Sequence, residues 1–290
     1  TQVYEGGVMM VRARDPIYKM SHLKGKKIGL SKSQNVIKND WWRVQEEQGI
    51  ELMLMLNDMT RDDVEIVEFP YPDDWYDKPE MLTPMENPNE YQLKRDHKHD
   101  LAFRPLETAL EKGTIDAMYS QSKVLSVLSE TTGKFKSIED LSRYPDWTLQ
   151  GANVPATLTV TEVACEKHPE LIVTLLKGLI KVGRWANAHK RAASAILNKQ
   201  TYYRDEEDTY EGIRRVEMVP VLTPINLQTL QIIKDFMLSH GYIENDFDVF
   251  KWAAPEFLEQ AAKELLEEEW KTRSTAKLPE AAAPLFGRVG

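Results

Sequence analysis

The first half of the chain alternates short apolar runs with longer amphipathic stretches. Short apolar runs bounded by polar turn residues are typical of buried strands, and apolar residues recurring every three or four positions predict helices. These patterns predict strands at 8–12, 27–30, 64–69 and 115–119, and helices at 39–57, 104–112 and 121–131. Because strands and helices alternate from Val67 onward, we expect a parallel sheet.

The second half of the chain is predicted to be mostly helical. After an expected strand at 155–160, the stretch from Pro169 to Asn198 predicts one long amphipathic helix with the proline in its first turn. Its apolar face is expected to consist of Leu171, Leu175, Leu179, Val182 and Trp185. Two more helices are predicted at 226–240 and 255–270. The sequence therefore predicts one α/β lobe followed by helices that belong to a partner lobe.

An irregular segment from Pro70 to Asp100 interrupts the pattern with five prolines and little periodicity. Loops of this length are usually lids, contact surfaces or insertions. Near its end the run RDHKHD places His97 and His99 among carboxylates, which are possible metal ligands. The charged surroundings favour a solvated loop instead, so we predict no metal site.

Composition and charge exclude several classes of function. The chain is 42% hydrophobic and 29% charged, which is sufficient for a packed core. A net charge of -9 argues against nucleic-acid binding, because phosphate recognition needs a basic face. The sequence has no apolar run long enough to predict a transmembrane helix. Its single cysteine, Cys165, excludes an internal disulfide and is expected to be a small buried hydrophobe.

Polar residues follow two of the predicted strands, at the edge where open α/β sheets bind ligands. The first group is Ser31, Ser33, Gln34 and Asn35, after the strand at 27–30. These side chains either cap the following helix or donate to an anionic or polar ligand at its N-terminus. The second group is Tyr119 and Ser120. Tyr119 is either a ligand contact or a half-buried structural residue.

Two adjacent tryptophans, Trp41 and Trp42, lie in the first turn of the helix predicted at 39–57. Neighbouring residues of one helix cannot both face the core, so one of them is a candidate for stacking on a ligand. Core packing is the alternative for each. The sequence contains no dinucleotide-binding, phosphate-loop, HExxH or GxSxG motif, and we predict no cofactor.

Several stretches together resemble the bilobed type 2 periplasmic-binding fold, and within it the sulfonate, taurine and NMT1/THI5-like substrate-binding proteins. They read GVMMVRARDPI, SHLKGKKIGLSKSQ, DDVEIV, ALEKGTIDAMYS and HPELIVTLLKGLIKVGRWANAH. A more specific stretch, DVFKWAAPEFLEQA at 248–261, is similar to aromatic sulfinate desulfinases built on the same fold. The resemblance extends over nearly the whole chain to about Ala262.

The resemblance implies an α/β protein whose three-layer lobes are joined by a hinge, with the first lobe incomplete in this chain. Residues 1–15 would end the first lobe and form a hinge strand, and 16–150 would form the second lobe. Residues 151–270 would form the return hinge and C-terminal helices that pack on the first lobe, followed by a tail at 271–290. The chain begins at Thr1 without methionine or a signal peptide, so we expect processing or truncation before it.

Two functions follow from the resemblance. The first is a solute-binding protein of ABC-transporter type that traps a small anionic sulfonate, sulfinate or aromatic ligand between its lobes. The second is a cofactor-free aromatic sulfinate desulfinase, a hydrolase of carbon–sulfur bonds, whose nucleophilic cysteine, histidine and arginine would precede Thr1. Cys165 does not match that nucleophile. We rank binding first, because this fold hosts many binders and few enzymes.

The resemblance also sets expectations about partners and location. A binding protein would be a monomer outside the cytoplasm, periplasmic or lipid-anchored, with a transporter permease as its partner. A desulfinase would be cytoplasmic. A third interpretation, an interaction module using the 70–100 segment, leaves the two polar strand ends unexplained.

Overall fold

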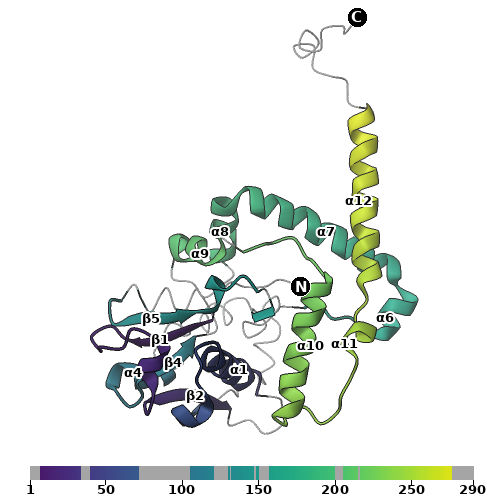
Figure 1. Cartoon of the computed structure of the whole chain (residues 1–290). Helices are drawn as coiled ribbons and strands as arrows, with labels where there is room; N and C mark the ends of the chain where they lie inside the picture. The colour runs from purple at the N-terminus through teal and green to yellow at the C-terminus, as the bar shows by residue number, and fades with distance from the viewer. Residues whose placement is uncertain are drawn as a thin grey trace, which may run out of the picture.

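The computed structural model describes residues 7–33, 40–71, 105–120, 130, 132–146, 148–149, 157–199, 205–214 and 216–275. These residues form one sheet with helices on both faces, and further helices that extend away from it (Figure 1). Some predictions fall outside the described residues. They concern Gln34, Asn35, the RDHKHD run, nearly all of the 121–131 helix and the tail after residue 275.

The sheet has five strands in the order β3-β2-β4-β1-β5. The strands are β1 (Val8–Arg12), β2 (Lys27–Ser33), β3 (Glu65–Tyr71), β4 (Ala117–Ser120) and β5 (Phe135–Asp140). The predicted parallel arrangement is confirmed for β2, β3 and β4, whereas β1 is antiparallel to both β4 and β5 and makes the sheet mixed. The expected hinge strand at 8–12 therefore lies inside this sheet. The sequence pattern missed β5, because charged and polar residues break up its apolar positions.

Both faces of the sheet are covered by helices, because its strands are apolar on both sides. In β1, Met9 and Val11 join a core cluster with α1 (Trp41–Leu56), while Val8 and Met10 join a second cluster with α4 (Pro105–Lys112). Alternate residues of a strand point to opposite faces, so one strand contributes to both cores. The predicted three-layer α/β/α arrangement is present here.

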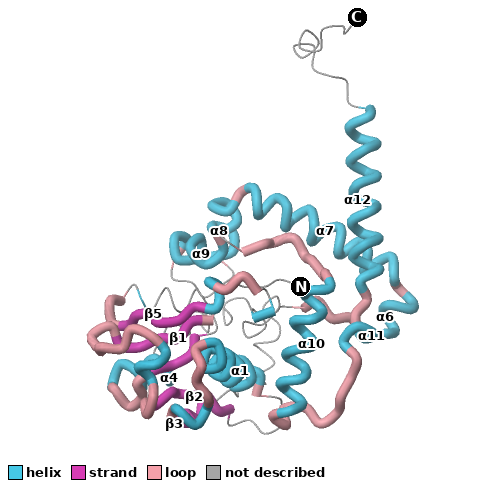
Figure 2. The backbone as a smooth tube through the Cα atoms, in the orientation of Figure 1, coloured by secondary structure: helices cyan, strands magenta, loops and turns pink. Residues whose placement is uncertain are grey.

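The remaining helices follow the sheet in the chain. They are α6 (Glu162–Lys167), α7 (Pro169–Ala188), α8 (Lys190–Asn198), α9 (Glu206–Ile213), α10 (Pro224–Ser239), α11 (Val249–Trp252) and α12 (Pro255–Thr275). Figure 2 shows the strands grouped on one side of the molecule, α10 near α1, and α7 and α12 away from the sheet. Ile172, Leu176 and Leu265 belong to a separate core between α7 and α12. None of the described helices is long and apolar enough to span a membrane.

Three predictions for the helical half were wrong. The single helix at 169–198 is two helices, because His189 between them has non-helical dihedrals (φ -132°, ψ 51°). Residues 157–160, the described part of the strand expected at 155–160, form no strand. The predicted apolar face of α7 (Leu171, Leu175, Leu179, Val182 and Trp185) is 39–63% exposed. Since α7 carries apolar residues on more than one side, periodicity did not reveal that α12 packs on the Ile172 and Leu176 side.

The position of α1 on the sheet depends on a glycine. Gly49 lies directly over the ring of Tyr119 in β4, and a Cβ atom at this position would lie 2.1 Å from Cζ of the tyrosine. Such a separation is far below van der Waals contact, so a side chain here would push the helix away from the sheet. The sequence pattern gave Gly49 no special role.

We predict that Gly49→Ala destabilises the chain by about 2–3 kcal/mol through overpacking. The matched control is Gly178→Ala in α7, where a Cβ would meet no atom within 4 Å. There the better helix propensity of alanine should stabilise the chain by up to about 1 kcal/mol. Urea unfolding of both variants measures the difference, and equal effects would contradict the close packing of α1 on Tyr119.

Candidate functional site

The candidate site begins where β2 ends. The sequence pattern ends this strand at Leu30, but β2 continues through Ser33, which pairs with Tyr71 of β3. Ser31 and Ser33 therefore do not cap the following helix. The N-cap of α1 is Asp40, whose carboxylate accepts hydrogen bonds from the backbone N–H groups of Arg43 (3.2 Å) and Ser33 (2.6 Å).

Ser31 holds a buried carboxyl group. Its backbone N–H donates to Oε2 of Glu46 (2.7 Å), and its hydroxyl donates to Oε1 of the same side chain (3.0 Å). Ser31 is only 4% exposed and Glu46 only 3%. The indole of Trp42 also donates to Glu46. Ser31 and Trp42, both predicted as ligand contacts, thus orient this acid.

Burial raises the pKa of Glu46 to about 8, and the nearby Glu107 adds to the effect, whereas the hydrogen bonds from Ser31 and Trp42 oppose it. A carboxyl group with such a pKa is largely protonated at neutral pH. It neither repels an anion nor requires a cationic partner, and it is able to exchange a proton near pH 7. Glu46 was not among the residues predicted from the sequence.

Two cations meet at the exposed side of the same edge. Nη2 of Arg43 lies 2.7 Å from Oε1 of Glu68, and Nζ of Lys32 lies 2.8 Å from Oε2 of Glu68. Arg43 also pairs with Glu47 of the same helix, with 3.8 Å between Nε of Arg43 and Oε2 of Glu47. The hydrogen bond from Lys32 and the nearby Arg43 lower the pKa of Glu68, which keeps it ionised. The edge thus binds a carboxylate between two positive groups.

The sequence pattern also missed Arg43 and Glu68. Arg43 lies two residues after Trp41, in the first turn of a helix that was already suspected of facing a ligand. A basic residue in this turn could have indicated an anion-binding side chain. Glu68 gave no signal, because its position opposite Arg43 depends on the register between β2 and β3.

Tyr119 and Ser120 have a structural position. Tyr119 is 1% exposed beneath Gly49, and Ser120 is buried as well. Burial, together with the charges of Glu46 and Asp140, raises the pKa of Tyr119. Tyr119 and Ser120 are therefore part of the buried core and not of the exposed sheet edge. The side chain of Trp41 lies outside the described part of the structure.

Cys165 lies apart from this edge. It is partly buried on α6 and packs against the α7–α12 core. No group of three or more His, Cys, Asp or Glu side chains that could hold a metal is found within the described ranges.

Comparison with known proteins gives relatives of two kinds, although no family model matches the chain. The 2'-hydroxybiphenyl-2-sulfinate desulfinase of Rhodococcus erythropolis is 24% identical over 269 residues, which cover 86% of this chain and 69% of that protein. The crystal structure of the desulfurization enzyme DszB has a TM-score of 0.66 at 22% identity, covering 91% of this chain and 78% of that one.

A second solved structure is a putative periplasmic sulfonate-binding protein from Methylobacillus flagellatus. It has a TM-score of 0.65 at 17% identity and covers 91% of this chain and 68% of its own. The chain therefore has the periplasmic-binding type of fold that these binding proteins and the desulfurization enzyme share. The comparisons do not decide between the two functions.

We predict that Glu46 makes stability depend on pH. Below about pH 4.5 the carboxyl is protonated in both folded and unfolded chains, so the contribution of Glu46 to the free energy of unfolding is fully present. As the pH rises to about 8, Glu46 ionises in the unfolded chain but stays protonated in the folded one. This stabilises the unfolded chain, and the contribution is lost. Glu46→Gln keeps the shape without the charge. It should therefore be more stable than the native chain by on the order of 5 kcal/mol at high pH, with little difference at low pH.

Urea unfolding at a series of pH values tests this expectation. Glu65→Gln, at an exposed position on the same sheet, is the control for the removal of a carboxylate. A stability difference for Glu46→Gln that stays constant with pH would contradict the raised pKa.

Proposed function

We propose that this chain binds a small anion bearing a sulfonate or sulfinate group at the edge formed by β2, β3 and the start of α1. The observation that supports the proposal is the pair of cations, Arg43 and Lys32, converging on the carboxylate of Glu68. Glu68 is 40% exposed, so an incoming anion reaches the two cations from solvent and competes with its carboxylate. A sulfur oxyanion has oxygen atoms that can bridge the two cations in the same way.

Glu46 fits this role because of its protonation. An ionised carboxylate buried at the same edge would add to the repulsion of the ligand by Glu68, whereas a protonated one does not. Ser31 keeps the acid in place with both of its donors. Ser33 lies on this edge and belongs to the proposal. Gln34, Asn35 and the side chain of Trp41 fall outside the described residues and stay candidates from the sequence.

A binding protein is our preferred assignment. The described residues provide oriented charges but no cysteine at this edge, and Cys165 packs elsewhere. In this role the ligand would be enclosed by a second lobe, and the exposed apolar residues of α7 would pack against that lobe. The protein would then act outside the cytoplasm and deliver its ligand to a membrane permease.

The second candidate is a desulfinase, supported by the 24% identical relative that matches 86% of the chain. Such an enzyme hydrolyses an aryl carbon–sulfur bond: the sulfur leaves as sulfite, and the ring carbon takes a proton. Glu46 is suited to proton exchange near neutral pH. The attacking cysteine would have to come from outside the present sequence.

We predict that Arg43→Gln weakens the binding of benzenesulfinate and methanesulfonate by about tenfold or more, because a charge-assisted contact is lost. The matched control is Lys27→Gln, which removes the same charge at the opposite ends of β2 and β3, where Lys27 pairs with Glu65 (3.8 Å). Isothermal titration should show no change for this control.

The same titrations separate the alternatives. Absence of binding for both anions, or equal weakening by both variants, would contradict the proposed site. In a longer protein that includes any sequence before Thr1, sulfite released from benzenesulfinate would favour the desulfinase, and tight binding without release would favour the binding protein.

A further inference from the structure

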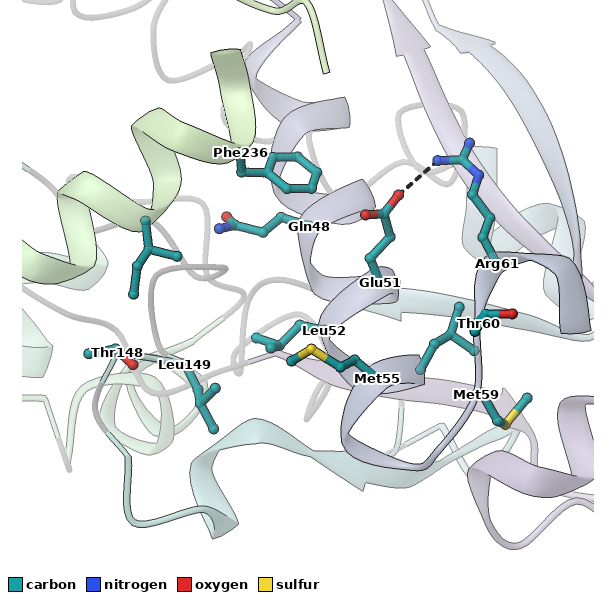
Figure 3. Close-up of a pocket in the computed structure, with 12 residues that line it drawn as sticks. Gln48, Glu51, Leu52, Met55, Met59, Thr60, Arg61, Thr148, Leu149 and Phe236 are labelled. Carbon is teal, nitrogen blue, oxygen red and sulfur yellow. Dashed lines mark hydrogen bonds and ion pairs between the residues drawn. The ribbon is translucent and has the colours of Figure 1, made fainter. Parts of the chain in front are cut away.

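A cavity of about 600 Å³ lies between α1 and α10, away from the edge that carries Arg43 and Glu46. It is lined by α1 from Gln48 to Met55, the start of the 3₁₀ turn η2 (Arg61–Asp63), residues 148–149 and one side of α10 (Figure 3). Most of the lining is apolar, with contributions from Leu52, Leu54, Met55, Met59, Ile232 and Phe236. A cavity of this volume suits a small molecule with an apolar body.

One buried polar atom in this cavity has no hydrogen-bond partner among the residues that the structure describes. Gln48 is 7% exposed, and its Oε1 accepts no hydrogen bond from any described residue. The side chain extends from α1 toward α10 and lines the cavity (Figure 3). A buried carbonyl without a donor costs about 1–3 kcal/mol, so a molecule that brings an N–H or O–H group to this position recovers that energy.

The charged groups at the rim are already paired with one another. Arg61 contacts Glu51 at 2.9 Å and Glu47 at 2.5 Å, and Nε2 of His240 lies 3.2 Å from Glu51. A charged ligand would have to break these pairs and lose its own hydration. The rim therefore favours a neutral ligand.

The apolar wall on α10 is held in place before any ligand arrives. The ring of Phe236 stacks on His240 with centroids 3.9 Å apart, and the histidine is in turn held by Glu51 of α1. A fixed aromatic face loses little conformational freedom on binding and favours a flat ligand.

We propose that this cavity binds a neutral aromatic molecule with one N–H or O–H group that donates to Gln48. The ligand contacts α1 on one side and α10 on the other, so it also links the sheet to the C-terminal helices. The inference does not depend on the anion site, since none of Arg43, Lys32, Glu46 and Glu68 lines the cavity. Glu47, which pairs with both Arg43 and Arg61, is the contact between the two sites.

A fluorescence titration with N-phenyl-1-naphthylamine tests the proposal on the full chain. This neutral probe has one N–H group and brightens in apolar surroundings, and its N-methyl derivative lacks the donor. Gln48→Met keeps the side-chain size and removes the acceptor. It should weaken the parent probe about tenfold and leave the N-methyl derivative within about twofold.

Two blocking variants locate the bound probe. Ile232→Trp and Met55→Trp fill the cavity from positions that are 37% and 62% exposed, so the fold should tolerate them, as a thermal melt will show. Each should abolish binding of both probes. Leu175→Ser, on the exposed face of α7, is the control for non-specific adsorption and should leave binding unchanged.

Three results would overturn the inference. They are native affinity in both tryptophan variants, loss of binding in Leu175→Ser, or equal weakening of both probes by Gln48→Met. Arg43→Gln should bind the probe normally, so failure of the anion site and failure of this cavity are distinguishable.

Discussion

The close seating of helix α1 on the sheet is the constraint on which both proposed sites depend. Gly49 allows the helix to rest directly on the ring of Tyr119, and no larger residue fits between them. Because the helix lies so close to the sheet, Glu46, one turn earlier in α1, is enclosed by the end of β2 and loses its hydration. The raised pKa of Glu46 is thus a consequence of backbone packing, and a helix held farther from the sheet would leave the carboxyl ionised.

The two halves of α1 have different chemistry. Its amino-terminal half faces the sheet edge with Arg43 and Glu46, where charge and proton exchange dominate. From Gln48 onward the helix faces α10 across a mostly apolar cavity, which the buried side-chain oxygen of Gln48 lines. Arg61 connects the two parts of the helix by pairing with Glu47 and Glu51, and the hydroxyl of Tyr242 also donates to Glu47. One helix therefore links the sheet edge, the cavity and the C-terminal helices.

Much of the sheet lobe was predictable because its patterns are local. Each face of β1 is apolar, so the uninterrupted apolar run Val8–Val11 correctly indicates a strand buried on both sides. The α7 helix shows where this approach fails. Its apolar residues surround the helix too broadly, and only the position of α12 determines that Ile172 is buried while Leu171 is exposed. The break at His189 likewise has no strong signal in the sequence.

The sequence by itself determined the order of most strands and helices, the mixed α/β character, and the presence of serines at the end of β2, since these depend on neighbouring residues. Only the tertiary structure decided what those serines do. Ser31 meets Glu46 because β2 continues three residues beyond its apolar run and α1 folds back over it. Arg43 and Lys32 meet on Glu68 because β2 and β3 pair in one register. Contacts between residues far apart in the chain fix burial, and burial fixes both the pKa of Glu46 and the unpartnered oxygen of Gln48.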